Sequence, residues 1–171
     1  MLTQNFYNIM ISLMKQVDES SNTKIPYTNH RGEQGTLGYS RVNFQGLYKV
    51  LSEGFNKASV YGIRFGTGTT PPAMTDYNLE APILDGSLSS EAVAPMQGFD
   101  TDHARIYVTH EVKNNSQNAV TITEAGVFGS PTTNNSLYYL LDRTVFDTPV
   151  TIPAGGTKSI TYAIVFDYPT A

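Results

Sequence analysis

Residues 103–112 alternate between apolar and polar side chains, and this pattern restricts the possible folds more than any other feature of the chain. A β-strand points successive side chains to opposite faces, so the alternation predicts a strand with one buried and one solvated face. The apolar face carries Ala104, Ile106, Val108 and Val112, and also His110. A second segment, 157–167, alternates in the same way, with Ile160, Tyr162, Ile164 and Phe166 on one face.

From about residue 41 onward, the chain shows only short strand patterns separated by turn residues. No helical pattern separates the later strands, which argues against parallel βαβ units. We therefore predict an all-β domain over residues 41–171, an antiparallel β-sandwich of the immunoglobulin-like or jelly-roll-like kind. A turn at 114–117 is expected to fold strand 103–113 back onto 118–123, and 84–102 to form a long connection with room for one edge strand. The candidate strands are 41–51, 58–65, 103–113, 118–123, 125–129, 136–142 and 157–167.

Residues 1–40 have a different pattern. Apolar residues from Phe6 to Val17 recur at helical spacing and predict an amphipathic helix over 4–17. A helix this short is marginal by itself, so its apolar stripe must pack either on its own β domain or on a neighbouring subunit. Residues 18–40 are polar and rich in turn formers, and we expect an extended arm there.

The glycine-rich sequence Gly66-Thr67-Gly68 is best interpreted as a structural turn. A phosphate-binding loop needs a lysine after its last glycine, and a dinucleotide-binding loop needs a glycine that opens a helix. Here Pro71-Pro72 follows, which blocks a simple helical continuation. The loop is therefore not expected to hold a nucleotide.

The histidines and carboxylates form no recognisable catalytic or metal-binding pattern. His103 and His110 lie seven residues apart on one predicted strand, on opposite faces and more than ~20 Å from each other, and so cannot share a metal unless the strand bends sharply. His110 falls on the apolar face and is expected to be buried or half-buried, while His30 lies in the predicted arm. No motif of a serine or cysteine nucleophile is present. We predict a protein that is not an enzyme and that has no cofactor and no metal.

The acidic residues that could act in pairs are not brought together by any spacing in the sequence. Glu124 lies between predicted strand residues, and it is expected either to pair with Arg143 or Arg64 or to be a solvated edge residue. The candidate carboxylates are Asp100, Asp102, Glu111, Glu124 and Asp142.

Composition excludes several function classes. The 171 residues contain no cysteine, which removes disulfides and thiolate chemistry and suits synthesis in a reducing cytoplasm. The net charge is −4 and no cluster of lysine or arginine occurs, so nucleic-acid binding is not expected. The N-terminal apolar run lacks the features of a secretion signal and is too short to span a bilayer.

Five motifs occur in order along residues 58–168, each once. They are GTGTTP at 66–71, DYNLEAPI at 76–83, ITEAGVF at 122–128, LLDRTVF at 140–146 and ITYAIVF at 160–166. Together they resemble small structural proteins of tailed bacteriophages, of the tail, collar or fibre type. The resemblance implies a non-enzymatic virion component that assembles with copies of itself and with other virion proteins. It also implies localisation in the virion after synthesis in the host cytoplasm.

An amphipathic helix joined to an arm suggests that the N-terminal segment contributes to assembly by contacting a neighbouring subunit. Tyrosines on a polar surface are typical of protein interfaces, and they also suit platforms on which sugars stack. The alternative function is therefore recognition of a host surface glycan or protein through residues such as 66–76. The expected interface residues are Phe6, Ile9, Met10, Leu13, Tyr27 and Tyr77.

Overall fold

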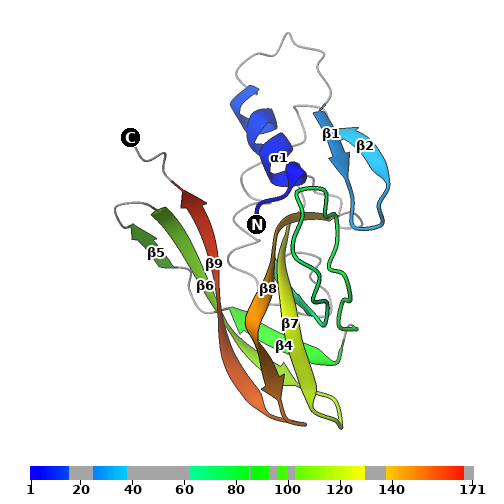
Figure 1. Ribbon diagram of the computed structural model, residues 1–171, viewed down its shortest axis with the longest axis vertical. Coiled ribbons are helices and arrows are strands. Elements are labelled where there is room, and N and C mark those ends of the chain that lie inside the picture. Colours follow the sequence, from blue (N-terminus) through cyan, green and yellow to red (C-terminus); the bar gives the residue numbers. More distant parts are fainter. Residues whose placement is uncertain are drawn as a thin grey trace.

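The computed structural model describes residues 1–15, 25–37, 62–84, 86–92, 96–99, 103–129 and 138–167. In these ranges the chain is mostly β, with antiparallel sheets that pack on each other and a short helix near the N-terminus (Figure 1). The predicted all-β, sandwich-like class with an N-terminal helix is thereby confirmed. The candidate strand 41–51 and the carboxylates Asp100 and Asp102 lie outside the described residues.

The first sheet has the order β3-β7-β8 and is antiparallel throughout. Its members are β3 (Gly62–Gly66), β7 (Val120–Gly129) and β8 (Tyr139–Ile152). The predicted strands 118–123 and 125–129 form the single strand β7, in which the pairing with β8 is irregular between Ile122 and Glu124. Opposite this irregularity, residues 146–149 of β8 have no partner on β7, which allows Pro149 to lie in a strand.

The second sheet is built around β6 (His103–Asn114), which pairs along its whole length with β9 (Thr157–Asp167). The other edge of β6 is covered in two pieces, by β4 (Leu88–Ala92) and β5 (Met96–Phe99). The segment 84–102 therefore supplies one edge of this sheet in two short strands. The two faces predicted for 103–112 are confirmed where side chains are described, since Val108, His110 and Val112 are buried and Glu111 is exposed.

The predicted hairpin between 103–113 and 118–123 is wrong, because β6 and β7 belong to different sheets. The buried side chain of Asn114 explains the change of sheet. Its Nδ2 donates to the carbonyl oxygens of Asn118 and Ile152, at 2.8 and 3.0 Å, and its Oδ1 accepts a hydrogen bond from the backbone of Ser116. These contacts tie the end of β6 to the end of β8 and make the turn a corner between the sheets.

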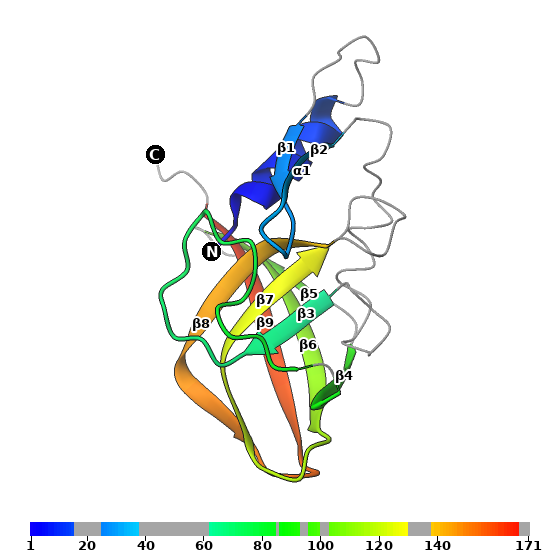
Figure 2. The ribbon, with the colours of Figure 1, turned by 90° about the vertical axis from the view of Figure 1, so that its right-hand side faces the viewer.

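The hydrophobic core lies between the two sheets. Apolar residues from facing strands are almost completely buried there, as the alternation in β6 and β9 requires. Figure 2 shows the first sheet in front of the second, with the N-terminal elements at one end. The members of the core include Ile63, Phe65, Val108, Val112, Ile122, Val127, Tyr139, Leu141, Ile152 and Tyr162.

The helix α1 (Gln4–Lys15) packs on its own β domain. Ile9 is buried in the core, and the Phe6 ring lies 6.0 Å from the Phe166 ring on β9. A hydrogen bond just before the helix fixes its start on β8, because the backbone N–H of Thr3 donates to the carbonyl oxygen of Leu141 at 2.9 Å. Of the two environments expected for the apolar stripe, Phe6 and Ile9 use the one provided by their own chain.

Part of the segment for which the composition predicts an extended arm is a folded hairpin. Strands β1 (Ile25–Thr28) and β2 (Gln34–Leu37) pair antiparallel and lie beside α1 (Figure 1). Asn29 closes the turn between them, since its Oδ1 accepts hydrogen bonds from the backbones of Arg31 and Glu33. Gly32 occupies the turn with φ at +79°, a conformation that glycine adopts without strain.

Candidate functional site

A buried ion pair joins strands β7 and β8 of the first sheet to the loop that follows β3. Glu124 on β7 is fully buried, and Arg143 on β8 is almost fully buried, with its Nε 2.8 Å from Glu124 Oε2. The sequence-based expectation that Glu124 pairs with Arg143 is thus confirmed, and the alternative of a solvated edge residue is wrong. A buried charge is stable only when it is paired and hydrogen-bonded, and both conditions are met here.

Glu124 also binds the backbone of the 67–83 loop. Its Oε1 accepts hydrogen bonds from the N–H groups of Gly68 and Ala81, at 3.1 and 2.8 Å, and its Oε2 accepts one from Glu80 at 3.1 Å. One carboxylate therefore holds both ends of the loop. Main-chain pairing at the base adds to this, because Thr67 N–H donates to Ala81 O and Ile83 N–H donates to Phe65 O.

Two acidic side chains of the loop also lie close to the Arg143 guanidinium. Asp76 Oδ2 lies 2.9 Å from Arg143 Nη1, and Glu80 Oε2 lies 3.5 Å from Nη2. Glu80 also accepts hydrogen bonds from the backbones of Thr69 and Thr70, each at 2.8 Å. We call Asp76, Glu80, Glu124 and Arg143 the charged centre. It combines three carboxylates with one guanidinium.

The protonation equilibria of the charged centre follow from these contacts. The hydrogen bond from the Thr70 backbone, followed by that from its hydroxyl, lowers the pKa of Glu80. Burial by itself would lower the pKa of Arg143, but hydrogen bonds to Asp76 and Glu124 outweigh it and raise that pKa. Arg143 is therefore a permanent cation that keeps the loop acids in place.

The glycines of this region are required by close packing. A Cβ on Gly68 would lie 2.6 Å from the Cβ of Glu80 and 2.7 Å from Glu124 Oε1, and a Cβ on Gly66 would meet the same carboxylate. Gly126 faces Leu79 and Leu140 at similarly short distances. The interpretation of the glycine-rich sequence as a structural turn agrees with this geometry, because the space of the missing side chains is filled by Glu124.

Asp142, the neighbour of Arg143, is buried on the opposite face of β8. Its Oδ1 accepts a short hydrogen bond from the hydroxyl of Tyr162 on β9. Burial, and then the charge of Asp142, raise the pKa of Tyr162 well above its ordinary value. This contact links the two sheets. The motif at 140–146 therefore contacts the motif at 122–128 through Arg143 and Glu124, and the motif at 160–166 through Asp142 and Tyr162.

The other histidines and tyrosines that the sequence marks have separate environments. His110 is fully buried, and its Nδ1 lies 3.1 Å from Ser90 Oγ. Its Nε2 has no hydrogen-bond partner among the described residues, and burial lowers its pKa to about 4. The His30 ring stacks on Tyr138 with centroids 3.5 Å apart, and burial lowers the pKa of His30. The side chain of His103 is not among those described. His30 and His110 therefore occupy separate sites, and the expectation that His103 and His110 share no metal stays a prediction.

The residues expected at an interface are distributed over two regions. Ile9 is buried and Phe6 and Met10 are half-buried, while the side chain of Leu13 lies outside the described part of the structure. Tyr27 is half-buried against Tyr139, with ring centroids 4.7 Å apart. Tyr77 retains 44% of its surface exposed. The structure therefore does not gather these residues into one surface.

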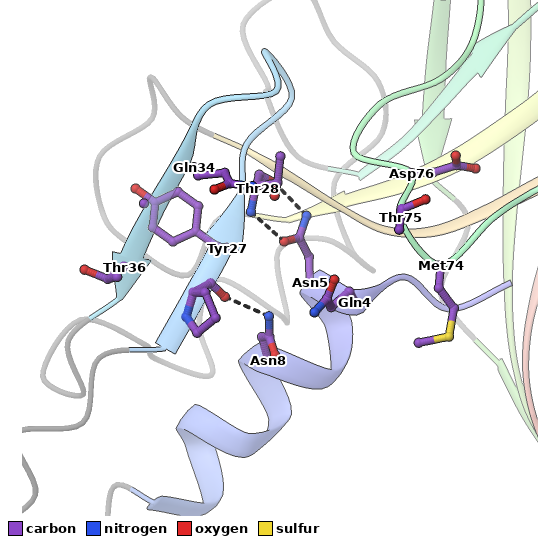
Figure 3. A pocket seen from close by; sticks show the side chains of 12 residues that line it. Gln4, Asn5, Asn8, Tyr27, Thr28, Gln34, Thr36, Met74, Thr75 and Asp76 are labelled. Carbon is purple, nitrogen blue, oxygen red and sulfur yellow. Dashed lines mark hydrogen bonds between the residues drawn. The ribbon is translucent and has the colours of Figure 1, made fainter.

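A pocket of about 380 Å³ lies between α1, the β1–β2 hairpin and the tip of the 67–83 loop. In Figure 3 the hairpin side chains form one wall, Met74, Thr75 and Asp76 form the other, and Gln4 and Asn5 lie between them. Asp76 belongs both to this pocket and to the charged centre. Sequence reasoning missed the pocket, and it missed Asp76 and Glu80 as partners of Arg143, because neither spacing nor motif brings these elements together.

Comparisons of the chain with family models, with curated proteins and with solved structures found no match. Within the described ranges no helix is long and apolar enough to cross a membrane. The described residues also hold no group of three or more acidic or histidine side chains arranged to bind a metal ion. The functional proposals below are based on the contacts of the charged centre and of the pocket.

Proposed function

We propose that the chain is a non-enzymatic structural component of a tailed-phage virion, associated with the tail, collar, fibre or capsid. The observation that carries this proposal is the meeting of separate motifs in one charged centre. Asp76 and Glu80 come from DYNLEAPI, Glu124 from ITEAGVF and Arg143 from LLDRTVF. All four side chains are used to hold a loop on a sheet, and a purely structural role for these motifs supports the resemblance to phage structural proteins.

Assembly requires exposed surface, and the loop and helix offer it. Met74, Tyr77 and Tyr7 are large side chains that remain 44–48% exposed. Met74 lies at the start of α1, because its carbonyl oxygen accepts the N–H of Gln4 at 2.9 Å. Since Ile9 is already buried in its own domain, we propose that contacts with other subunits use this exposed surface, with copies of the chain or other virion proteins as partners.

The proposal is tested on virus particles and on the isolated chain. Phage particles that carry the gene for this chain are purified by density. Mass spectrometry should then detect the chain in a fixed ratio to other virion proteins. Light scattering should give the mass of a defined oligomer, which the double substitution Met74→Ser with Tyr77→Ser lowers and the exposed-site control Val165→Ser does not. Absence of the chain from purified particles would overturn the virion assignment.

A second candidate function is recognition of a host surface glycan or protein. The exposed Tyr77 stands beside Asp76 and Asn78 on the 67–83 loop, and the pocket opens next to the same loop. Aromatic rings next to amide and carboxylate groups are common in binding surfaces. Binding of the isolated chain to host cells, reduced by Tyr77→Ser, would favour this function over a purely structural one.

A further inference from the structure

The pocket between α1, the β1–β2 hairpin and the loop tip has walls that are fixed to one another. Asn5, a residue that is only 5% exposed, donates from Nδ2 to the carbonyl oxygen of Thr28 and accepts from the Thr28 N–H, at 2.7 and 2.9 Å. Asn8 donates to the carbonyl oxygen of Pro26 at 2.7 Å. Hydrogen bonds therefore join the helix to the hairpin, while the Gln4–Met74 backbone contact joins it to the loop. A pocket with such walls is formed before any ligand arrives.

The side chains around the pocket are mostly uncharged hydrogen-bonding groups. Gln4, Gln34 and Thr75 are exposed at its surface and offer amide and hydroxyl groups. Among the described residues, the lining contains no lysine, arginine or histidine, so none of these lining side chains attracts a phosphate, sulfate or carboxylate ligand. A ligand that matches this lining is neutral and carries several hydroxyl or amide groups.

Asp76 supplies the single formal charge of the lining. Its Oδ2 is held by Arg143 Nη1 at 2.9 Å and by the N–H of Ala73 at 2.9 Å. Both contacts use the same oxygen, so Oδ1 can accept a hydrogen bond from a ligand. A carboxylate that is fixed in this way favours a hydroxyl donor and repels an anion.

Apolar surface completes the lining. The Tyr27 ring lies across Gly35, which has no side chain to displace it, and the exposed Met74 side chain stands on the facing wall (Figure 3). Ligand sites usually combine such apolar surface with a few polar groups that fix orientation. Sugars have both properties, since a pyranose presents C–H groups on its faces and hydroxyl groups around its rim.

We propose that this pocket binds a neutral saccharide of one or two residues, or the end of a longer neutral glycan. Its volume of about 380 Å³ lies at the lower end of the range of small-molecule sites, roughly 300–1,000 Å³. The inference concerns a site and a ligand class, and it holds whether the chain works in a virion or elsewhere.

The test fills the pocket and leaves the rest of the chain unchanged. Thr75→Trp places a large ring at the pocket, and Thr157→Trp is the matched control, because Thr157 is an exposed threonine at the start of β9, at the other end of the sandwich. Circular dichroism verifies the fold of both variants. The full-length wild type and both variants are applied to an array of neutral and acidic glycans, and each neutral mono- or disaccharide that binds is titrated by calorimetry.

We expect the wild type and Thr157→Trp to bind a neutral saccharide with equal affinity and Thr75→Trp to lose binding. Gln34→Ala should weaken it by about three- to tenfold, the effect of one hydrogen bond. The proposal is overturned if the wild type binds no glycan, binds only acidic glycans, or binds equally well after Thr75→Trp. Because the particle analysis above uses no glycan, failure here leaves the virion proposal to its own test.

Discussion

The two sheets bury polar side chains in opposite ways. In the first sheet, Glu124 and Arg143 are buried as charges, and Glu124 accepts four hydrogen bonds at 2.8–3.1 Å from the loop and from Arg143. In the second sheet, His110 is buried as a neutral ring, with Ser90 at one nitrogen and, in the described part of the chain, no partner at the other. The first arrangement is stable because Glu124 is paired with Arg143 and hydrogen-bonded to the loop, and the second because the ring stays uncharged.

The difference decides what each group can do for the protein. A charged centre with many partners fixes the position of an irregular segment, here the 67–83 loop, and it fails when a partner is removed. A neutral buried histidine holds nothing in place through charge, but it must remain unprotonated for the sheet to stay packed. The first region should therefore be sensitive to mutation, and the second to pH.

The largest effect is expected from Arg143→Met. It removes the cation from among three carboxylates and leaves Glu124 buried without an ionic partner, so the free energy of unfolding should fall by about 3–5 kcal/mol. Urea denaturation monitored by circular dichroism measures the change. Arg31→Met, at an exposed arginine of the hairpin turn, is the control and should change stability by less than about 0.5 kcal/mol.

A double variant separates the ion pair from the loss of packing. Glu124→Gln keeps the shape of the side chain and removes its charge, so Glu124→Gln with Arg143→Met should be more stable than the sum of the single changes predicts. Strict additivity of the two effects would mean that the buried ion pair contributes no coupling, and the contrast drawn between the sheets would fail.

The second effect is a loss of stability in acid caused by His110. Its pKa is about 4 in the folded chain and near 6.5 when unfolded, so the unfolded state binds the proton more readily between these values. Stability is complete above pH 6.5, decreases as the pH falls toward 4 and then levels off. The full decrease is about 3 kcal/mol, since one pKa unit corresponds to about 1.4 kcal/mol.

Urea denaturation at a series of pH values, on the wild type and on His110→Leu, measures this contribution. In the variant, the free energy of unfolding should fall less steeply between pH 6.5 and 4 than in the wild type, whatever its value at neutral pH. His30→Gln is a useful comparison, because the pKa of His30 is also lowered but its ring is only half-buried. An unchanged slope in His110→Leu would show that another group causes the acid sensitivity.

The strand faces could be predicted from the sequence because they depend on local alternation. The pattern of β9 correctly places Ile160, Tyr162 and Ile164 in the core, and that of β6 places His110 there. Glu124 was also identifiable, since a lone carboxylate in an apolar strand needs a cation, and Arg143 was one of two candidates. These inferences need only the period of a strand and the cost of burying a charge.

Features that depend on contacts between distant segments were not predictable. Asn114 looks like an ordinary turn residue, and only its buried amide, bonded to the end of β8, shows that the turn changes sheets. The candidate strand 136–142 covers only the first residues of β8, because no local pattern shows that a bulge opposite β7 lets Pro149 lie in a strand. Asp76 and Glu80 reach Arg143 across more than sixty residues of sequence, and no local pattern encodes that approach.

The smallest of the expected effects comes from Gly68→Ala, which tests how closely the loop is packed on the charged centre. The new methyl group would lie 2.7 Å from Glu124 Oε1 and 2.6 Å from the Cβ of Glu80, so the loop must shift away from its carboxylate. We expect a loss of about 1–3 kcal/mol in urea denaturation, typical of overpacking. Thr67→Ala, one residue earlier and exposed, should have almost no effect. If Gly68→Ala were equally harmless, the loop would be adjustable, and the charged centre would hold it less firmly than its hydrogen bonds indicate.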